Sequence, residues 1–517
     1  MSLLFFVLSI PVLLTIPAAF AYPLFEKAGI PGWKALIPFY NFFIWVKLVE
    51  KSYWWYLWLI IPFINVFTFM LLCIELIKGF EKNKPLDQVL VALFPFVYMP
   101  WLGTKNELKW IAPEDRPKIK KSTIREWTDA IVFAVIAASI IRIFLMEAYT
   151  IPTSSMEKSL LVGDYLFVSK MAFGPKSPQT PIAFPFVHHT LPMTKITKSY
   201  VEWLELPYHR YPGFDVVKNN DVVVFNYPSG DTVVLERQNE DYYQIVRDKE
   251  LELAERYGDK YKPGMGRKAI WKAYHVTDRP VDKRENYIKR CVAIAGDVIE
   301  IKDRQLFVNG EMADNPENMQ FMYDVYTNGT GFNKKTIDKL DITEGGRMNN
   351  SHYVLPLSED KLKVLEKYPN VKKITPRIQA KGEIYSPIFP HDTKNFQWNQ
   401  DNFGPLTIPK AGENINISLN NIALYKKIIM KYEDNDFEIK GDKIYINGEL
   451  ATTYTFKQDY YWMMGDNRHN SADSRYWGFV PEDHVVGKAV FVWLSLDPNK
   501  SLSDGKIRWN KIFRTIK

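Results

Sequence analysis

Hydrophobic positions divide the chain into two parts with different periodicities. Long apolar runs occupy the first part, at 3–21, 54–78, 88–103 and 127–146. A helix that crosses a bilayer needs about 20 such residues, so these runs are typical of membrane segments. After residue 150 the pattern changes to short β-branched runs separated by Gly, Asn, Asp and Pro. This second pattern predicts a mostly antiparallel β domain.

The first apolar run, 3–21, has an alternative interpretation. It ends in Ala19-Phe20-Ala21, which is typical of the cleavage site of a secretory signal peptide. No Lys or Arg precedes Lys27, so the positively charged start of such a peptide is missing. We therefore favour a retained span. The last run, 127–146, follows a Thr123-x-x-Glu126 capping box and predicts a helix that leads into the β domain.

Basic residues predict the orientation of these spans. Loop 104–126 is rich in Lys and Arg, within a chain of net charge +7. A nucleic-acid-binding segment is one interpretation of this loop. Apolar runs flank it on both sides, so we favour a cytoplasmic loop between spans, as the positive-inside rule predicts. The helix at 127–146 then carries the β domain to the outer face.

Two similar segments, which fit either an internal repeat or two independent hairpins, frame an insertion in the second part. Residues 299–311 and 437–449 both show two short strands, a polar turn and then Asn-Gly, which predicts hairpins. Residues 229–286 are a charged insertion, and 358–367 is the helix expected in this half. The expected domains are a membrane region with about three spans and a basic loop (1–126), a transmembrane helix (127–147), a main β domain (148–311 and 437–500), an inserted β-rich extracytoplasmic subdomain (312–436) and a tail (501–517).

Metal chemistry is not indicated by the residue pattern. The eight His are scattered, and the two Cys lie in unrelated contexts without metal-ligand spacing. Phosphate-binding glycine loops and a Gly-x-Ser-x-Gly elbow are also missing from the sequence. The remaining candidate chemistry is a serine activated by a base other than His.

Ser155 and Lys289 are the candidate nucleophile and base. Ser155 lies in a hydroxyl-rich turn directly after the last apolar run. A buried lysine can become neutral near pH 7 and accept a serine proton. In an extended strand, Lys289 shares a face with Tyr287 and Cys291, and Arg290 faces away. Taken alone, Lys289 fits a surface lysine better than a catalytic base. A third polar stretch, 464–481, fits a hydrogen-bonded structural loop equally well.

Together, these stretches resemble the sequence boxes of bacterial type I signal peptidases (leader peptidases), the membrane-anchored Ser/Lys endopeptidases of the S26 type. The matching segments are Thr153-Ser-Ser-Met156 with Gly163-Asp164, Asn220-Asp-Val-Val-Val-Phe225, Tyr287-Ile-Lys-Arg290 with Gly296-Asp297, and Gly465-Asp-Asn-Arg468 with Asn470-Ser471-x-Asp473-Ser-Arg475-x-Trp477-Gly478.

The resemblance implies roles for individual residues. Ser155 is the implied nucleophile and Lys289 the implied general base. Ser471 orients the lysine, Asp473 and Arg475 form a supporting ion pair, and the Thr153 hydroxyl joins the Ser155 N–H in the oxyanion hole. The implied pocket for small substrate residues is lined by Tyr149, Ile151 and Ile288. No metal or other cofactor is implied.

Two substitutions depart from the family pattern. Lys158-Ser159 stands where the family usually has Pro-Thr, which puts the geometry of that turn in question. His469 stands where an acidic residue is usual, so we expect an altered surface contact.

The resemblance implies an endopeptidase that removes N-terminal signal peptides from translocated preproteins. The expected partners are those preproteins, membrane lipid and the secretion translocon, and not nucleic acid. The expected location is the bacterial inner membrane, with several spans and an extracytoplasmic catalytic domain. Two alternatives are a catalytically inactive membrane-anchored binding or scaffold protein of the same fold, and a self-cleaving DNA-binding repressor with a related Ser/Lys fold. Four apolar runs argue against the repressor.

Overall fold

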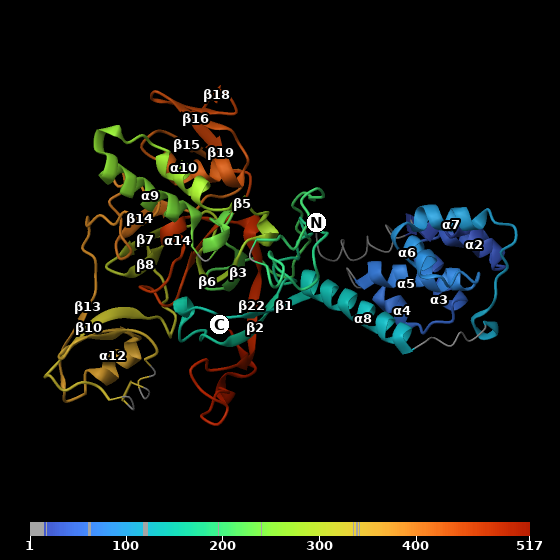
Figure 1. Ribbon diagram of the computed structural model, residues 1–517, viewed down its shortest axis with the longest axis horizontal. Helices are drawn as coiled ribbons and strands as arrows, with labels where there is room; N and C mark the ends of the chain where they lie inside the picture. The colour runs from blue at the N-terminus through green and yellow to red at the C-terminus, as the bar shows by residue number, and fades with distance from the viewer. Residues whose placement is uncertain are drawn as a thin grey trace. The chain divides into compact units, whose positions relative to one another are not determined.

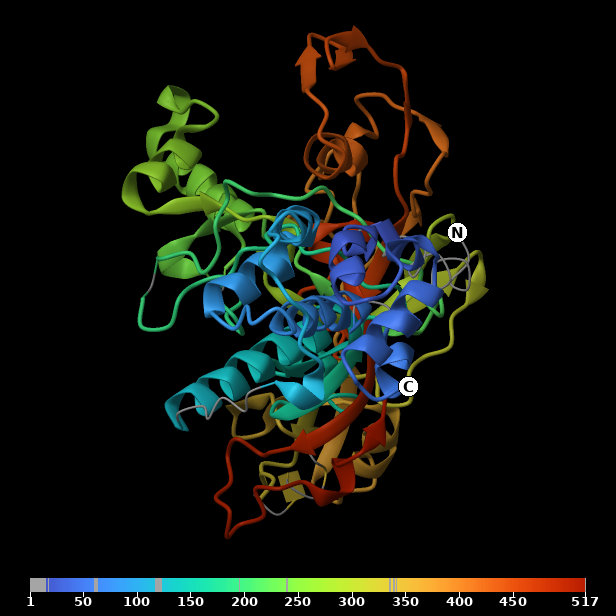
Figure 2. The same cartoon turned by 90° about the vertical axis from the view of Figure 1, so that its right-hand side faces the viewer.

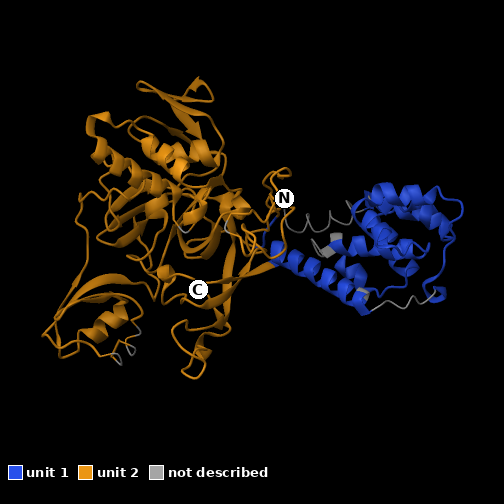
Figure 3. Ribbon diagram, viewed as in Figure 1, with its two compact units in different colours: residues 1–145, 212–214 blue, residues 146–211, 215–517 orange. Residues whose placement is uncertain are grey.

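The chain forms two compact units, which are described separately. The computed structural model describes residues 15–16, 18–59, 64–116, 123–194, 196–238, 240–333, 336–337, 340 and 342–516. Unit 1 comprises residues 1–145 with 212–214, and unit 2 comprises 146–211 with 215–517 (Figure 3). Unit 1 is helical, whereas unit 2 is built mainly from β-sheets (Figure 1).

Short helices form most of unit 1, drawn in blue in Figure 2. They pack around a core that includes Phe25, Trp45 and Leu72, each 0% exposed. The helices are α2 (Tyr22–Lys27), α3 (Tyr40–Leu48), α4 (Trp54–Trp58), α5 (Ile64–Lys78), α6 (Pro85–Leu93) and α7 (Pro95–Gly103).

One helix of the described residues is long and apolar enough to cross a membrane by itself. It covers Glu126–Leu145, with a mean hydropathy of 2.1, which confirms the predicted helix at 127–146. It covers most of α8 (Thr123–Ile140) and the π-helical turn that follows it, Ile141–Leu145. The next residue, Met146, begins β1 (Met146–Thr150).

The other predicted spans differ from continuous helices. Run 88–103 falls on α6 and α7, which are bent by 119° and form either a broken span or a re-entrant loop. The bend follows from Pro95, which has no N–H to donate and disfavours helical geometry at Phe94. Run 54–78 falls on α4 and α5, with residues 60–63 outside the described residues. Run 3–21 falls largely on residues 1–14 and 17, also outside them.

An eight-stranded sheet is the centre of unit 2. Its order is β1-β2-β22-β3-β6-β20-β21, with β23 paired to β22, and every neighbouring pair is antiparallel, as predicted. The central pairing of β3, β6 and β20 brings together three sequence stretches that are far apart in the chain. The strands after β1 are β2 (Asp164–Ser169), β3 (Val222–Asn226), β6 (Asn286–Ala293), β20 (Tyr460–Met464), β21 (Val480–Pro481), β22 (Val485–Ser495) and β23 (Arg514–Thr515).

The two predicted hairpin segments are confirmed. Both contain three short antiparallel strands, and both Asn-Gly turns have positive φ, with 55° and 82° at Asn309 and Gly310 and 54° and 84° at Asn447 and Gly448. Two successive positive φ values define the type I′ turn that matches strand twist. The strands are β7 (Val298–Lys302), β8 (Gln305–Val308) and β9 (Glu311–Met312), then β16 (Phe437–Lys440), β17 (Lys443–Ile446) and β18 (Glu449–Leu450).

Residues 321–376 form a separate four-stranded sheet. It has its own apolar core, and the expected helix at 358–367 is present as α12 (Glu359–Leu365). The sheet order is β11-β12-β10-β13. The strands are β10 (Phe321–Thr327), β11 (Gly346–Asn349), β12 (His352–Leu357) and β13 (Val371–Pro376). We call this sheet and α12 the inserted sheet. Further along, β14 (Phe403–Thr407) pairs with β7.

The charged stretch 229–286 contains two helices that were not predicted from its sequence. They are α9 (Tyr242–Tyr257) and α10 (Met265–Ala273). A signal for α9 is present in the sequence, because Asp241 is an N-cap whose carboxylate accepts from the N–H groups of Tyr243 and Gln244.

Candidate active site

Ser155 lies in a tight turn between β1 and β2. The turn is a 3₁₀ helix, Ser154–Met156, in which Ser155 is 8% exposed. Two backbone hydrogen bonds join the ends of the loop that contains this turn, from Ile151 N–H to Asp164 O and from Gly163 N–H to Ile151 O, both 2.9 Å. A Cβ at Gly163 would lie 1.9 Å from Leu496 O, and φ is +87° there, so only glycine fits this position. The nucleophile candidate is therefore held on a closed backbone loop.

Lys289 contacts Ser155 directly. It extends from β6, where Val223 is its neighbour on β3. Its Nζ donates to Ser155 Oγ at 2.7 Å and to Ile288 O at 3.0 Å. The lysine is 4% exposed, and its Nζ lies 5.6 Å from the centre of the Tyr287 ring. The two candidates, 134 residues apart in sequence, are thus within hydrogen-bond reach.

Burial gives Lys289 the character of a base. It lowers the pKa of Lys289 from 10.5 to about 8, and Asp473 and Asp466 limit the decrease. An ammonium group removed from water is less stable than the neutral amine, which explains the direction. At pH 7 about one molecule in ten therefore carries a neutral amine beside Ser155.

Asp473 and Arg475 form the ion pair that the resemblance implies. Arg475 Nε and Nη2 donate to the two Asp473 oxygens at 2.9 and 2.8 Å, and both residues are at most 1% exposed. Burial by itself would raise the pKa of Asp473, but Arg475 outweighs it and the pKa is lowered. Asp473 also caps α14 (Ser474–Trp477) and accepts from Gly465 N–H at 3.1 Å.

Ser471 lies beside the nucleophile turn but does not bond Lys289. A Cβ at Gly465 would lie 2.2 Å from Ser471 Oγ and 2.5 Å from Ser155 O, so Gly465 leaves room for both. Ser471 Oγ is buried, and the Ser471 side chain contributes to the lowered pKa of Asp473. Its orienting role remains a prediction.

The other predicted site residues lie around the same turn. Thr153 is exposed, has an extended backbone and does not cap the 3₁₀ helix with its side chain. Tyr149, Ile151 and Ile288 belong to one apolar cluster that also contains Met156. The three proposed pocket residues are therefore neighbours in space.

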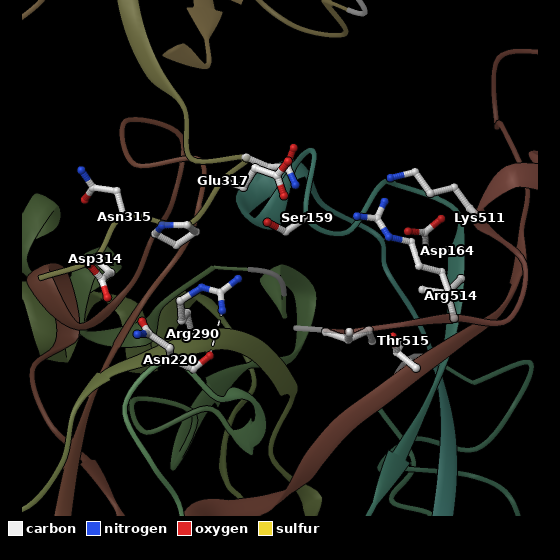
Figure 4. Close-up of a pocket in the computed structure, with 14 residues that line it drawn as sticks. Ser159, Asp164, Asn220, Arg290, Asp314, Asn315, Glu317, Lys511, Arg514 and Thr515 are labelled. Atoms are coloured by element: carbon white, nitrogen blue, oxygen red, sulfur yellow. Dashed lines mark hydrogen bonds between the residues drawn. The ribbon is translucent and has the colours of Figure 1, made fainter. Parts of the chain in front are cut away.

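Arg290 and Asp466 form a second buried ion pair that sequence reasoning missed. Arg290 faces away from Lys289, as expected, but it donates from Nε and Nη2 to Asp466 at 2.9 and 2.8 Å. Ser159 Oγ donates to the same carboxylate at 2.6 Å. Arg290 also donates to Asn220 O, at the edge of a cavity of about 490 Å³ (Figure 4). Both residues lie in the matching sequence segments, so the sequence marked each of them but did not show that they form a pair.

The expectation that His469 alters a surface contact is wrong. Its side chain is 4% exposed, and Nε2 lies 2.7 Å from Asp401 Oδ1. Nδ1 accepts from Met322 N–H at 3.2 Å, on β10 of the inserted sheet. The residue therefore joins the 464–481 loop to the inserted sheet. Among the described residues, no group of three or more His, Cys, Asp or Glu side chains could hold a metal ion.

Two known protein families match separate parts of this chain. The family described as signal peptidase, peptidase S26, matches residues 124–355 and 412–494. A family of unknown function, DUF5684, matches residues 33–113.

Full-length relatives are similar at low identity. Signal peptidase I of Haemophilus influenzae is 22% identical over 462 residues, covering 88% of this chain and 93% of the relative. Signal peptidase I of Buchnera aphidicola subsp. Baizongia pistaciae is 24% identical over 366 residues, covering 70% and 74%. Signal peptidase I of Helicobacter pylori strain J99 is 24% identical over 396 residues, covering 74% and 90%.

Proposed function

This chain belongs to the signal peptidase S26 family, and from that premise we propose that it is a membrane-anchored serine endopeptidase that removes N-terminal signal peptides from translocated preproteins. The observation that carries the proposal is the 2.7 Å contact between Lys289 Nζ and Ser155 Oγ, with the lysine buried and its pKa lowered to about 8. A neutral amine at that distance is the partner that a serine hydroxyl needs to become a nucleophile.

The proposed reaction has two steps. In the first, Lys289 accepts the Ser155 proton while Oγ attacks the carbonyl carbon of the scissile peptide bond. The C–N bond then breaks, and Lys289 returns the proton to the leaving amine. In the second step, Lys289 accepts a proton from water while the water oxygen attacks the acyl carbon. The bond from that carbon to Ser155 Oγ then breaks, and Lys289 returns the proton to Oγ. The Ser155 N–H and the Thr153 hydroxyl are the proposed donors to the oxyanion, where one donor typically contributes about 3–4 kcal/mol.

Substrate choice and location follow from the same arrangement. The apolar positions of Tyr149, Ile151 and Ile288 favour small residues before the cut, because a larger side chain would clash with them. Ser155 lies ten residues beyond Leu145, the end of the candidate span. We propose an inner-membrane protein with an extracytoplasmic site and several spans. Its partners would be signal-peptide-bearing preproteins, membrane lipid and the secretion translocon.

Cleavage of a defined preprotein tests the proposal. The purified full-length protein in detergent is incubated with a preprotein that carries Ala-x-Ala before its mature sequence. We expect one cut after the second Ala, read by mass spectrometry, and no cut with Ser155→Ala at the same concentration of folded protein. Substituting Asp for the Ala at the cut should abolish cleavage. An intact preprotein with the unaltered enzyme would favour the inactive membrane-anchored binding protein instead.

A further inference from the structure

The turn that follows Ser155 has a backbone that proline cannot adopt. Lys158 has φ +72°, whereas the proline ring holds φ near about −65°. The family's usual Pro at this position is therefore incompatible with the turn seen here. The left-handed conformation is also unfavourable for a residue with a Cβ. Contacts outside the turn must therefore stabilise it.

Thr343 provides one of these contacts from just before β11 of the inserted sheet. Its Oγ1 donates to Glu157 Oε1 at 2.8 Å, and Glu157 is 3% exposed. Glu157 directly precedes Lys158 and follows the 3₁₀ helix that contains Ser155. Thr343 thus restrains the chain on the C-terminal side of the nucleophile.

Glu344 restrains the N-terminal side through two asparagines. Asn470 Nδ2 donates to Glu344 Oε2 at 2.6 Å and to Ser154 Oγ at 3.2 Å. Asn467 Nδ2 donates to Glu344 Oε2 at 3.1 Å and to Ser154 O at 3.2 Å. Hydrogen bonds to a carboxylate are stronger than bonds between neutral groups. The Glu344 charge therefore fixes both amides against Ser154.

Asn467 also reaches the nucleophile itself. It is 0% exposed, and its N–H donates to Ser155 O at 3.1 Å. Fixing the Asn467 side chain therefore also fixes the backbone donor that holds Ser155. The residues that bracket Ser155 are bonded, directly or through one side chain, to two consecutive residues beside the inserted sheet.

We propose that Thr343 and Glu344 are positioning residues for Ser155, and that the inserted sheet performs the restraint that the family's proline supplies elsewhere. The inference rests on the proposed peptidase function. Neither residue touches the reacting atoms. Both act by holding the turn in the geometry in which Ser155 Oγ meets Lys289 Nζ.

Kinetics and backbone exchange together test this role. We expect Thr343→Val and Glu344→Gln each to lower kcat about 10- to 100-fold with KM nearly unchanged, because small misplacements of a reacting group have effects of this size. Hydrogen exchange of the peptide that covers residues 154–159 should become faster in both variants. Thr343→Ser, which keeps the hydroxyl, should restore kcat. Glu359→Gln is the matched control, because Glu359 is exposed on α12 and pairs there with Lys363.

The outcomes separate this inference from the proposed function. Unchanged kcat and unchanged exchange at 154–159 would overturn it, and so would a rise in kcat, which would make the segment an inhibitory contact. If the unaltered enzyme does not cleave the preprotein, the proposed function fails. Hydrogen exchange still tests the positioning role in that case, because unchanged exchange at residues 154–159 in the variants would contradict it. A thermal melt of each variant shows whether a lost kcat reflects unfolding.

Discussion

Unit 2 contains two serine–lysine pairs that look alike at the level of a single contact. Lys289 donates to Ser155 Oγ, and Lys427 donates to Ser229 Oγ. Burial lowers the pKa of each lysine to about 8. Ser229 is 3% exposed and Ser155 is 8% exposed. By distance and pKa alone, either pair would qualify as a nucleophile and its base.

Their surroundings differ in ways that matter for catalysis. Ser229 is buried between Pro228 and Gly230, which are also buried, whereas Ser155 follows the exposed residues Pro152 and Thr153. The residues next to Ser229 in the chain therefore leave no exposed surface from which a substrate could reach it.

The two lysines also have different neighbours. Lys427, at the end of α13 (Ile422–Lys427), lies 5.7 and 5.5 Å from the ring centres of Tyr243 and Tyr432. Asp241 and Asp231 raise its pKa, while Arg284 and Arg247 lower it further. Lys427 thus belongs to a closed ionic and aromatic cluster that joins α13 to the start of α9. A nucleophile needs access in addition to a desolvated base, and of these two pairs the Ser155 pair is the one with exposed residues just before its serine.

The largest expected effect is the loss of activity when Lys289, and not Lys427, is replaced by methionine. Lys289→Met should lower kcat at least about 10³-fold, because a serine protease that loses its base keeps only binding and oxyanion stabilisation. Lys427→Met should leave kcat per folded molecule within about twofold of the unaltered enzyme. Initial rates with the Ala-x-Ala preprotein measure both. Comparable losses in the two variants would remove the distinction between the pairs.

A proline substitution sharpens what is special about the Ser155 turn. Lys158→Pro, although it restores the family's residue, should lower activity and destabilise the fold by about 3 kcal/mol, because the ring cannot reach the observed φ. Lys158→Gly is the matched variant and should remain active, because glycine adopts positive φ without a steric penalty. Preprotein cleavage and urea unfolding measure both changes. A fully active proline variant would show that the turn is not held as described.

The pH dependence of kcat/KM shows which of the two lysines controls the reaction. Since only neutral Lys289 can accept the serine proton, kcat/KM should rise about tenfold per unit below the pKa of about 8 and level off above it. Lys427 titrates in the same range, yet Lys427→Met should leave the midpoint unchanged. A rate profile from pH 6 to about 10 checks this. If the midpoint of the rate profile moved in Lys427→Met, the pH dependence of the rate would belong to Lys427 and not to Lys289.

The smallest expected effect concerns stability. Well below pH 8 both folded and unfolded chains hold the Lys289 proton, so the folded state bears the full cost of burying the charge, about 3 kcal/mol from the pKa shift. This cost disappears as the pH rises from about 8 towards the unfolded pKa of about 10.4. Lys289→Met should therefore be more stable than the unaltered protein near pH 7, with an advantage that shrinks above pH 8. Urea unfolding at pH 7 and about pH 9.5 measures the difference.

Patterns of consecutive residues predicted several elements correctly. The apolar run at 127–146 became one helix, because about 20 apolar residues suffice for a span whatever they pack against. The Asn-Gly turns at 309–310 and 447–448 formed because these residues adopt positive φ readily. α9 was missed because charged residues dominate its exposed faces and only Tyr242, Ile245 and Leu253 are buried. Run 88–103 bent because Pro95 interrupted the helix.

The sequence by itself determined which residues were candidates, since Ser155, Lys289, Asp473 and Arg475 were recognisable from their types and from the boxes they occupy. Only the tertiary structure decided which serine each lysine meets, that Arg290 pairs with Asp466, and that Glu344 reaches Ser154 through Asn470. The physical reason is that a hydrogen bond and a lowered pKa depend on distance and on exclusion of water. Residues more than a hundred positions apart in the chain create both conditions, so the box around Lys289 made it a candidate but could not show its contact with Ser155.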